Sequence, residues 1–127
     1  RFTSYDGSKN GILVLGLDSM KARKQIVELL VKCPHKPETV IDGRMGAEHY
    51  QQHIYNNITM SKYDKNWYSD DDADPEPCTR KATSYCSNMS GSFISNSIKN
   101  IVMKQPYFNE ITFNFSTLIL DKKNLVS

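Results

Sequence analysis

The chain has 127 residues, which is enough for one domain with a modest core. The 16 lysines and arginines nearly balance the 14 aspartates and glutamates, and no basic block occurs, so the composition gives no support to nucleic-acid binding. No apolar run is long enough for a membrane span. The three cysteines, Cys33, Cys78 and Cys86, match neither a disulfide framework nor a zinc pattern. A cytoplasmic setting without a membrane partner is therefore expected.

The segment from Gly11 to Lys32 carries the clearest pattern in the chain. Ile12–Leu15 is a short apolar run, which is typical of a strand buried on both faces in a parallel sheet. A helical pattern follows at once and stops at Pro34. The expected buried face of this helix consists of Ala22, Ile26, Leu29, Leu30 and Cys33. Asp18 thus follows the carboxyl end of the strand, where open α/β sheets bind ligands, although Asp18 or Ser19 is also suited to cap the helix.

A second strand is predicted at Thr39–Asp42. Two strands joined through one helix form a parallel, right-handed βαβ unit. This strand is expected to end in an Asp42-Gly43 turn, which places Arg44 between glycines at the same sheet edge as Asp18. Glycines there permit a ligand to approach the backbone closely. An ordinary turn with an exposed arginine explains the same pattern.

The middle of the chain is polar. Residues 48–57 alternate only in part between apolar and polar residues, which predicts an edge strand. His49 and His53 are four residues apart within it, but this pair indicates a metal site only weakly because a third ligand is missing. Residues 59–77 end in an acidic, proline-containing run, which predicts a mobile crossover loop. Cys78 follows at the expected start of a helix, whose dipole favours a thiolate; a half-buried spectator thiol is the alternative.

The last third of the chain predicts a helix and two strands. Residues 82–104 show the longest helical pattern, and Gly91 within it suggests a close packing contact. Ile111–Phe115 alternates between apolar and polar residues, as in a half-buried strand. Residues 118–120 form a last short apolar run before a polar tail. The predicted fold class is therefore α/β.

In this order, the segments resemble the second half of the ThiF/MoeB-like adenylyltransferase fold, which ubiquitin-activating enzymes share. Two early motifs carry the resemblance: LVLGLDSMKARKQI is similar to a strand–Asp–Arg–helix segment of the family, and VIDGRMGAE is similar to its next strand and turn. Three later motifs follow: the acidic loop ending in PCTRKA, the helix SNMSGSFISNSIKNIV and the closing strands ITFNFSTLIL. The resemblance covers roughly residues 10–121.

The resemblance implies the second half of a Rossmann-like, mainly parallel sheet with flanking helices and closing antiparallel strands. Residues 1–127 would then be a single partial domain, the C-terminal half of an adenylation domain. The glycine-rich phosphate loop of the family has no counterpart in this sequence, and neither have the zinc-binding cysteine pairs of many members. The missing N-terminal half of the fold is therefore an expected partner. A homodimer or heterodimer is also expected, because members of the family are usually dimers.

The family activates a carboxylate, often the C-terminus of a ubiquitin-like protein, as an acyl adenylate at the expense of ATP. By similarity, Asp18 would bind Mg²⁺ beside the phosphates of ATP, and Arg23 would support this cofactor site. Arg44 would face the ligand edge, and Cys78 would accept the acyl group in members that form a thioester. The expected function is thus part of an ATP-dependent adenylyltransferase, inactive as this segment alone, that acts on a ubiquitin-like protein or a small carboxylate. A non-catalytic partner subunit, or a protein-binding module of the same fold, is the alternative.

Overall fold

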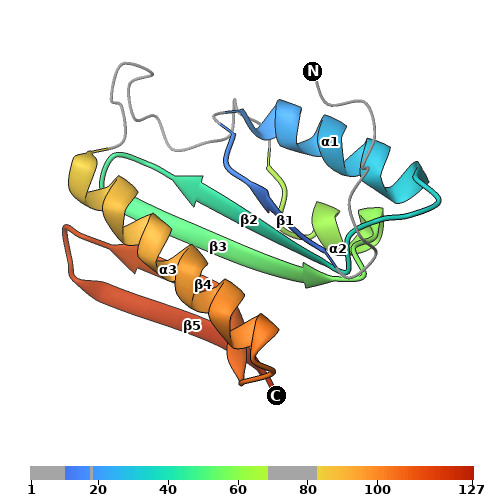
Figure 1. Cartoon of the computed structure of the whole chain (residues 1–127). Helices are drawn as coiled ribbons and strands as arrows, with labels where there is room; N and C mark the ends of the chain where they lie inside the picture. Colours follow the sequence, from blue (N-terminus) through green and yellow to red (C-terminus); the bar gives the residue numbers. More distant parts are fainter. Residues whose placement is uncertain (1–10, 18, 69–82) are drawn as a thin grey trace. The chain divides into compact units, whose positions relative to one another are not determined.

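The computed structural model describes residues 11–17, 19–68 and 83–127, which are coloured in Figure 1. In this part the chain is a mixed α/β structure whose five-stranded sheet has the order β1-β2-β3-β4-β5. Strands β3, β4 and β5 are antiparallel to their neighbours, and the single parallel pair of the described sheet is β1 with β2. The predicted α/β class and the closing antiparallel strands are confirmed, but the expectation of a mainly parallel sheet is wrong. Antiparallel pairing dominates because short turns join β2 to β3 and β4 to β5.

The described chain divides into two compact units. Unit 1 comprises residues 1–41 and 55–74, and unit 2 comprises residues 42–54 and 75–127. The boundary between the units therefore falls within two strands, β2 (Thr39–Met45) and β3 (His49–Asn56). The other elements of unit 1 are β1 (Ile12–Leu15), α1 (Met20–Lys32) and α2 (Met60–Asp64). The other elements of unit 2 are α3 (Ser84–Val102), β4 (Tyr107–Asn114) and β5 (Ile119–Val126).

Helix α1 begins where the sequence predicts but buries a different face. Ser19 is the N-cap, and its side chain accepts a hydrogen bond of 3.2 Å from the backbone N–H of Ala22. The buried face consists of Met20, Arg23, Val27 and Leu30. The predicted face is right for Leu30, which is fully buried, and in part for Ile26, which packs against the core, but it is wrong for Leu29, which is 38% exposed. The prediction failed because the buried series includes an arginine, which sequence rules assign to the solvent side.

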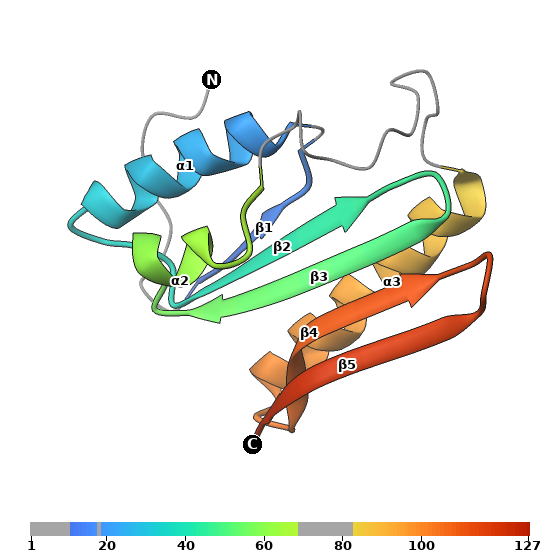
Figure 2. The ribbon, with the colours of Figure 1, turned by 180° about the vertical axis from the view of Figure 1, so that it is seen from behind.

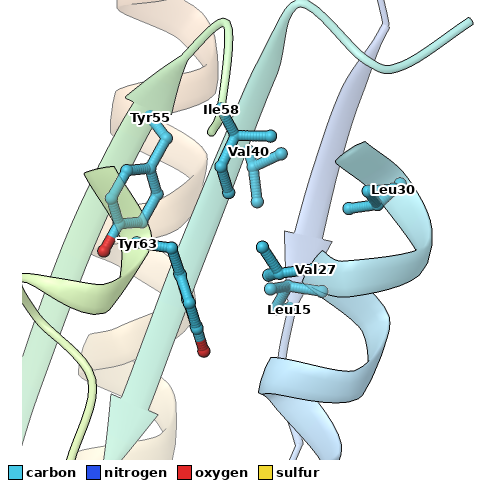
Figure 3. Packing of buried hydrophobic residues seen from close by; sticks show 7 residues of the cluster. All are labelled: Leu15, Val27, Leu30, Val40, Tyr55, Ile58 and Tyr63. Atoms are coloured by element: carbon cyan, nitrogen blue, oxygen red, sulfur yellow. The ribbon is translucent and has the colours of Figure 1, made fainter. Parts of the chain in front are cut away.

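The core of unit 1 is apolar (Figure 3). Side chains of β1, α1, β2, β3 and the segment that follows β3 point toward one another there. The cluster consists of Leu15, Val27, Leu30, Val40, Tyr55, Ile58 and Tyr63. Each aliphatic side chain of this kind contributes about 1.5–3 kcal/mol by burial. The expectation that β1 is buried on both faces is wrong, because β1 ends the described sheet and Val14 is 39% exposed.

The predicted loop at residues 59–77 contains the short helix α2. Thr59 caps this helix through the backbone N–H of Lys62, and α2 packs beside α1. The indole N–H of Trp67 donates to the carbonyl of Met20 at 2.9 Å. Lys24 of α1 lies over the Trp67 ring, so apolar and polar contacts both hold this segment. Residues 69–77 lie outside the described residues.

Unit 2 places α3 on one face of β3 and β4, and Figure 2 shows these strands beside β5 from behind. Tyr50 of β3 stacks on Phe93 of α3, with ring centroids 5.7 Å apart, and Phe93 also contacts Phe113 of β4. The predicted packing role of Gly91 is wrong, because a Cβ atom there would meet no atom within 4 Å. The close approach occurs at Gly43, where a Cβ atom would lie 3.1 Å from the Tyr50 hydroxyl.

Three strands differ from the prediction in their bounds or in their place in the sheet. Strand β2 continues to Met45, so the turn expected at Asp42-Gly43 is wrong, and Arg44 is a strand residue. Strand β3 pairs with β4 and lies between β2 and β4, so it is not an edge strand. Strand β5 runs to Val126 and includes most of the tail. His53 of β3 lies beside Glu110 of β4, whereas the polar side chains of β5 are exposed.

Candidate functional site

The residues predicted for a site are described to different extents. Arg23 belongs to unit 1 and Arg44 to unit 2, and both side chains are buried, at 4% and 5% exposure. Asp18 and Cys78 lie outside the described residues. The magnesium site proposed for Asp18 and the acyl acceptor proposed for Cys78 therefore stay predictions.

Arg23 holds the turn between β1 and α1. Its guanidinium Nη2 donates a hydrogen bond to the carbonyl of Leu17, and its backbone N–H donates to the carbonyl of Ser19 at 3.2 Å. The Ser19 hydroxyl in turn caps α1. The residues on both sides of Asp18 are thus held by hydrogen bonds from the first turn of the helix.

The face of the unit 2 sheet that lies away from α3 is polar. Tyr50 and Gln52 contact α3, so alternation along β3 directs His53 to the other face. The β3–β4 register pairs His53 with Glu110. Gly43 faces Tyr50, so its neighbours Asp42 and Arg44 also lie on the face of His53. We call Asp42, Arg44, His53 and Glu110 the polar row.

Asp42 and Arg44 form a buried ion pair within the polar row. The Nε and Nη2 atoms of Arg44 lie 2.9 and 2.8 Å from the same oxygen, Oδ2 of Asp42. The side chains are 5% and 0% exposed. Removing one partner of such a pair is costly, because the remaining charge would be left in a poorly solvated place. The pair therefore fixes the guanidinium plane on β2.

His53 and Glu110 form the outer, more exposed part of the polar row. Nδ1 of His53 lies 3.2 Å from Oε1 of Glu110, and the side chains are 13% and 29% exposed. Burial lowers the pKa of His53 below its usual value, and the positive charge of Arg44 lowers it further. The carboxylates of Glu110 and Asp42 act in the opposite direction but do not reverse the shift. The histidine therefore favours its neutral form near neutral pH.

A second buried polar chain joins β3 to α3. The Tyr50 hydroxyl donates to Oε1 of Gln52 at 2.7 Å, and Nε2 of Gln52 donates to the Ser97 hydroxyl at 2.8 Å. Tyr50 and Gln52 are fully buried. The sequence did not predict these hydrogen bonds. The one signal for them was the series of serines within residues 82–104.

The histidines of β3 do not form a metal site with each other. His49 and His53 are four residues apart on a strand, a separation of roughly 13 Å along its axis. Among the described residues, no three histidine, cysteine, aspartate or glutamate side chains are arranged to hold a metal ion.

The two described cysteines differ in access. Cys86 is fully buried in α3, and its thiol lies 3.5 Å from the His49 carbonyl, so its expected shielding is confirmed. Cys33 is half-buried, and its thiol donates to the Leu29 carbonyl at 3.1 Å. Its expected place on a buried helix face is wrong, because Leu29 beside it faces solvent.

In the described part of the chain, no helix combines the length and apolarity needed to cross a bilayer. No protein-family model matches the sequence, and no curated protein matches it either.

The described residues contain two distinctive polar arrangements, which are the β1–α1 turn held by Arg23 and the polar row.

Proposed function

We propose that this chain is part of an ATP-dependent adenylyltransferase with a Rossmann-like fold, acting in the cytosol on a carboxylate substrate. The observation that carries the proposal is the anchored turn between β1 and α1. A buried arginine one helical turn into α1 holds the Leu17 carbonyl, while Ser19 caps the helix. Arginine is rarely buried unless it has a partner. The burial of Arg23 against the Leu17 carbonyl therefore indicates that the position of this turn is important.

Arg23 is a positioning residue in this proposal. Its guanidinium donates to the protein backbone, so it orders the residues beside Asp18 and does not itself contact the nucleotide. Asp18 is the residue that would hold Mg²⁺. Magnesium is commonly bound by one or two carboxylates together with substrate phosphates and water, so a single aspartate between Leu17 and Ser19 suits it. Bound magnesium would neutralise charge on the phosphates.

The test is ATP–pyrophosphate exchange by the whole protein that carries this chain, with small carboxylic acids and a ubiquitin-like protein offered as substrates. Asp18→Asn should lower the exchange rate by about two orders of magnitude, because metal and charge stabilisation are lost. Glu28→Gln, the same change of charge on the exposed face of α1, is the matched control and should retain the rate. An unchanged exchange rate in a folded Asp18→Asn variant would show that Asp18 does not hold a catalytic magnesium ion.

Arg23→Lys separates positioning from direct contact. Lysine keeps the charge but lacks the planar fork, so it cannot hold the Leu17 carbonyl in the same way. We expect a lower exchange rate with little change in the KM for ATP, since Arg23 is proposed to act through the turn. A rise in KM alone would instead assign Arg23 to nucleotide binding.

A second candidate is a non-catalytic, protein-binding subunit of the same fold. The turn and strand of the β4–β5 hairpin favour it, because their apolar side chains are exposed: Leu118 73%, Ile119 55%, Leu120 48% and Leu125 59%. Exposed apolar residues gathered in one hairpin are typical of a contact surface. This candidate predicts that the chain associates with an active subunit or with a second copy of itself. It also predicts no exchange activity when the active subunit is absent.

A further inference from the structure

Strand β5 lies at one end of the sheet order, with β4 on one side and no further described strand on the other (Figure 2). Its backbone N–H and C=O groups that point away from β4 are therefore available to pair with another strand. The side chains of residues 119–125 are all exposed, so neither face of β5 is covered by another described element. A sheet edge of this kind is a surface that an added strand can extend.

One face of β5 carries an ordered series of side chains. The β4–β5 register places Lys123 opposite Glu110, so Lys123 lies on the sheet face away from α3. Ile119, Asp121 and Leu125 lie on the same face, because alternate residues of a strand point the same way. Along the strand this face reads apolar, acidic, basic, apolar. The charges of Asp121 and Lys123 are exposed and form no ion pair within the described residues.

We propose that β5 is a dimer interface, at which β5 of a second copy of this chain pairs with it in antiparallel fashion and Asp121 of each copy lies opposite Lys123 of the other. The sheets of the two copies would then continue through this strand pair. The inference goes beyond the proposed function, since it assigns the surface, the partner and the register. It does not require adenylation.

Charge complementarity selects the register. A two-fold axis normal to the sheet keeps every side chain on its own face, so one residue of β5 must lie opposite itself. With Lys122 at the axis, the face away from α3 gains two Asp121–Lys123 pairs and two pairs of Ile119 with Leu125. With Asp121 or Lys123 at the axis, like charges would meet directly, which is unfavourable.

The like-charge contact of the chosen register is Lys122 opposite itself. The Lys122 ammonium lies 5.2 Å from the centroid of the Phe108 ring of its own chain. This cation–π contact draws the charge back over β4 and away from the axis. Lysines on an edge strand normally discourage pairing, but Asp121 offers each Lys123 an opposite charge in this register. The edge is therefore selective for a second copy.

The first test measures the dissociation constant of the dimer by sedimentation of the whole chain. Asp121→Lys makes the charges of this face wholly basic, and Lys123→Asp makes them wholly acidic. Each variant alone should dimerise roughly tenfold more weakly or worse, because two attractions become two repulsions. An equimolar mixture should form a heterodimer of about the original affinity, since opposite charges then meet at both pairs.

The matched control is Glu28→Lys, which makes the same charge change as Asp121→Lys on the exposed face of α1. It should dimerise like the original chain. A monomer at every concentration would overturn the inference. A dimer that neither β5 charge variant weakens would overturn it as well, because the contact would then lie elsewhere.

The second test fixes the register by disulfide formation in a Cys33→Ser/Cys78→Ser background. Lys122→Cys would face its own copy with Cα atoms about 4.5–5.5 Å apart, which a disulfide can bridge. Mild oxidation should therefore cross-link most of this variant. Leu120→Cys, on the same face, would lie about 13 Å along the strand from its own copy and should cross-link poorly. Equal cross-linking of the two variants would contradict the register and overturn the inference.

The outcomes separate this interface from the proposed function. A dimer that responds to the β5 charges, in a protein without pyrophosphate exchange, would retain the interface and reject adenylation. Exchange activity by a protein that stays monomeric would retain adenylation and reject the interface. Neither the sedimentation nor the cross-linking measurement uses ATP, so neither depends on the adenylation proposal.

Discussion

The two units of the described chain have interiors of different chemistry. Unit 1 buries a compact apolar cluster contributed by β1, α1, β2 and the α2 segment. Unit 2 buries an ion pair and a chain of hydrogen-bonded side chains as well as its apolar residues. An apolar core tolerates similar shapes, whereas a buried polar interior depends on each partner being present. The comparison teaches that the interior of unit 2 should tolerate substitution less well than that of unit 1.

The largest effect is expected from Asp42→Ala in unit 2. The change leaves Arg44 buried without its carboxylate, which should lower the free energy of unfolding by about 3–5 kcal/mol. Urea denaturation measures this loss, and hydrogen exchange should show it first in the strands of unit 2. Asp64→Ala removes an exposed carboxylate that lies 3.6 Å from Lys24 and should cost only about 0.2–1 kcal/mol.

The apolar double variant Asp42→Leu/Arg44→Met sharpens this prediction. Replacing both partners removes the uncompensated charge, so stability should return close to that of the original chain. A cost for Asp42→Ala as small as that for Asp64→Ala would show that the ion pair does not organise unit 2.

An intermediate effect is expected from Leu30→Ala in unit 1. Leu30 is fully buried in the apolar cluster, so its truncation should cost about 2–4 kcal/mol through lost burial and a cavity. Leu29→Ala, one residue earlier on α1, is the control and should cost less than about 1 kcal/mol, because Leu29 faces solvent. Equal costs in urea denaturation would contradict the helix face described for α1.

The smallest effect concerns the pH dependence of stability. The pKa of His53 is lowered in the folded state, so the unfolded chain binds its proton at a higher pH. This contribution to stability is fully present above the ordinary histidine pKa. It falls as the pH decreases from that value to the lowered pKa of the folded state, below which it is lost. Thermal unfolding from about pH 8 to about pH 5 measures the trend.

The variant His53→Gln isolates the contribution of this histidine. Glutamine does not titrate, so the variant should lose stability less steeply on acidification than the original chain. His35→Gln removes an exposed histidine and should leave the slope as it was. A slope that is the same in all three proteins would assign the pH dependence to other groups.

The local order of helices and strands could be predicted from the sequence to a useful extent. The start of α1 follows from Ser19, the end from Pro34, and the α3 segment from its long apolar periodicity. These signals are local, because caps, prolines and periodicity act within one or two turns. The short helix α2 was missed, although Thr59 is a capping residue, since its packing beside α1 has no signal in the local sequence.

The candidate site was predicted only in part. Arg23 was named from the family resemblance and Arg44 from the glycines that flank it, but their contacts were not predicted, and Arg44 was expected in a turn. His53 and Glu110 are 57 positions apart, so only the pairing of β3 with β4 brings them together. Their interaction has no local signal, because it depends on a register that is set by which face of β3 contacts α3.

The sequence by itself determined the α/β class, the approximate helices and strands, and the presence of charged residues in or near the first two strands. Tertiary structure alone decided which of these charges are buried and which partners compensate them. The physical reason is that a sequence pattern shows only where polar and apolar residues fall. Burial of a charge depends on a partner that supplies the opposite charge or a hydrogen bond. Asp42 is that partner for Arg44, and the Leu17 carbonyl accepts from Arg23.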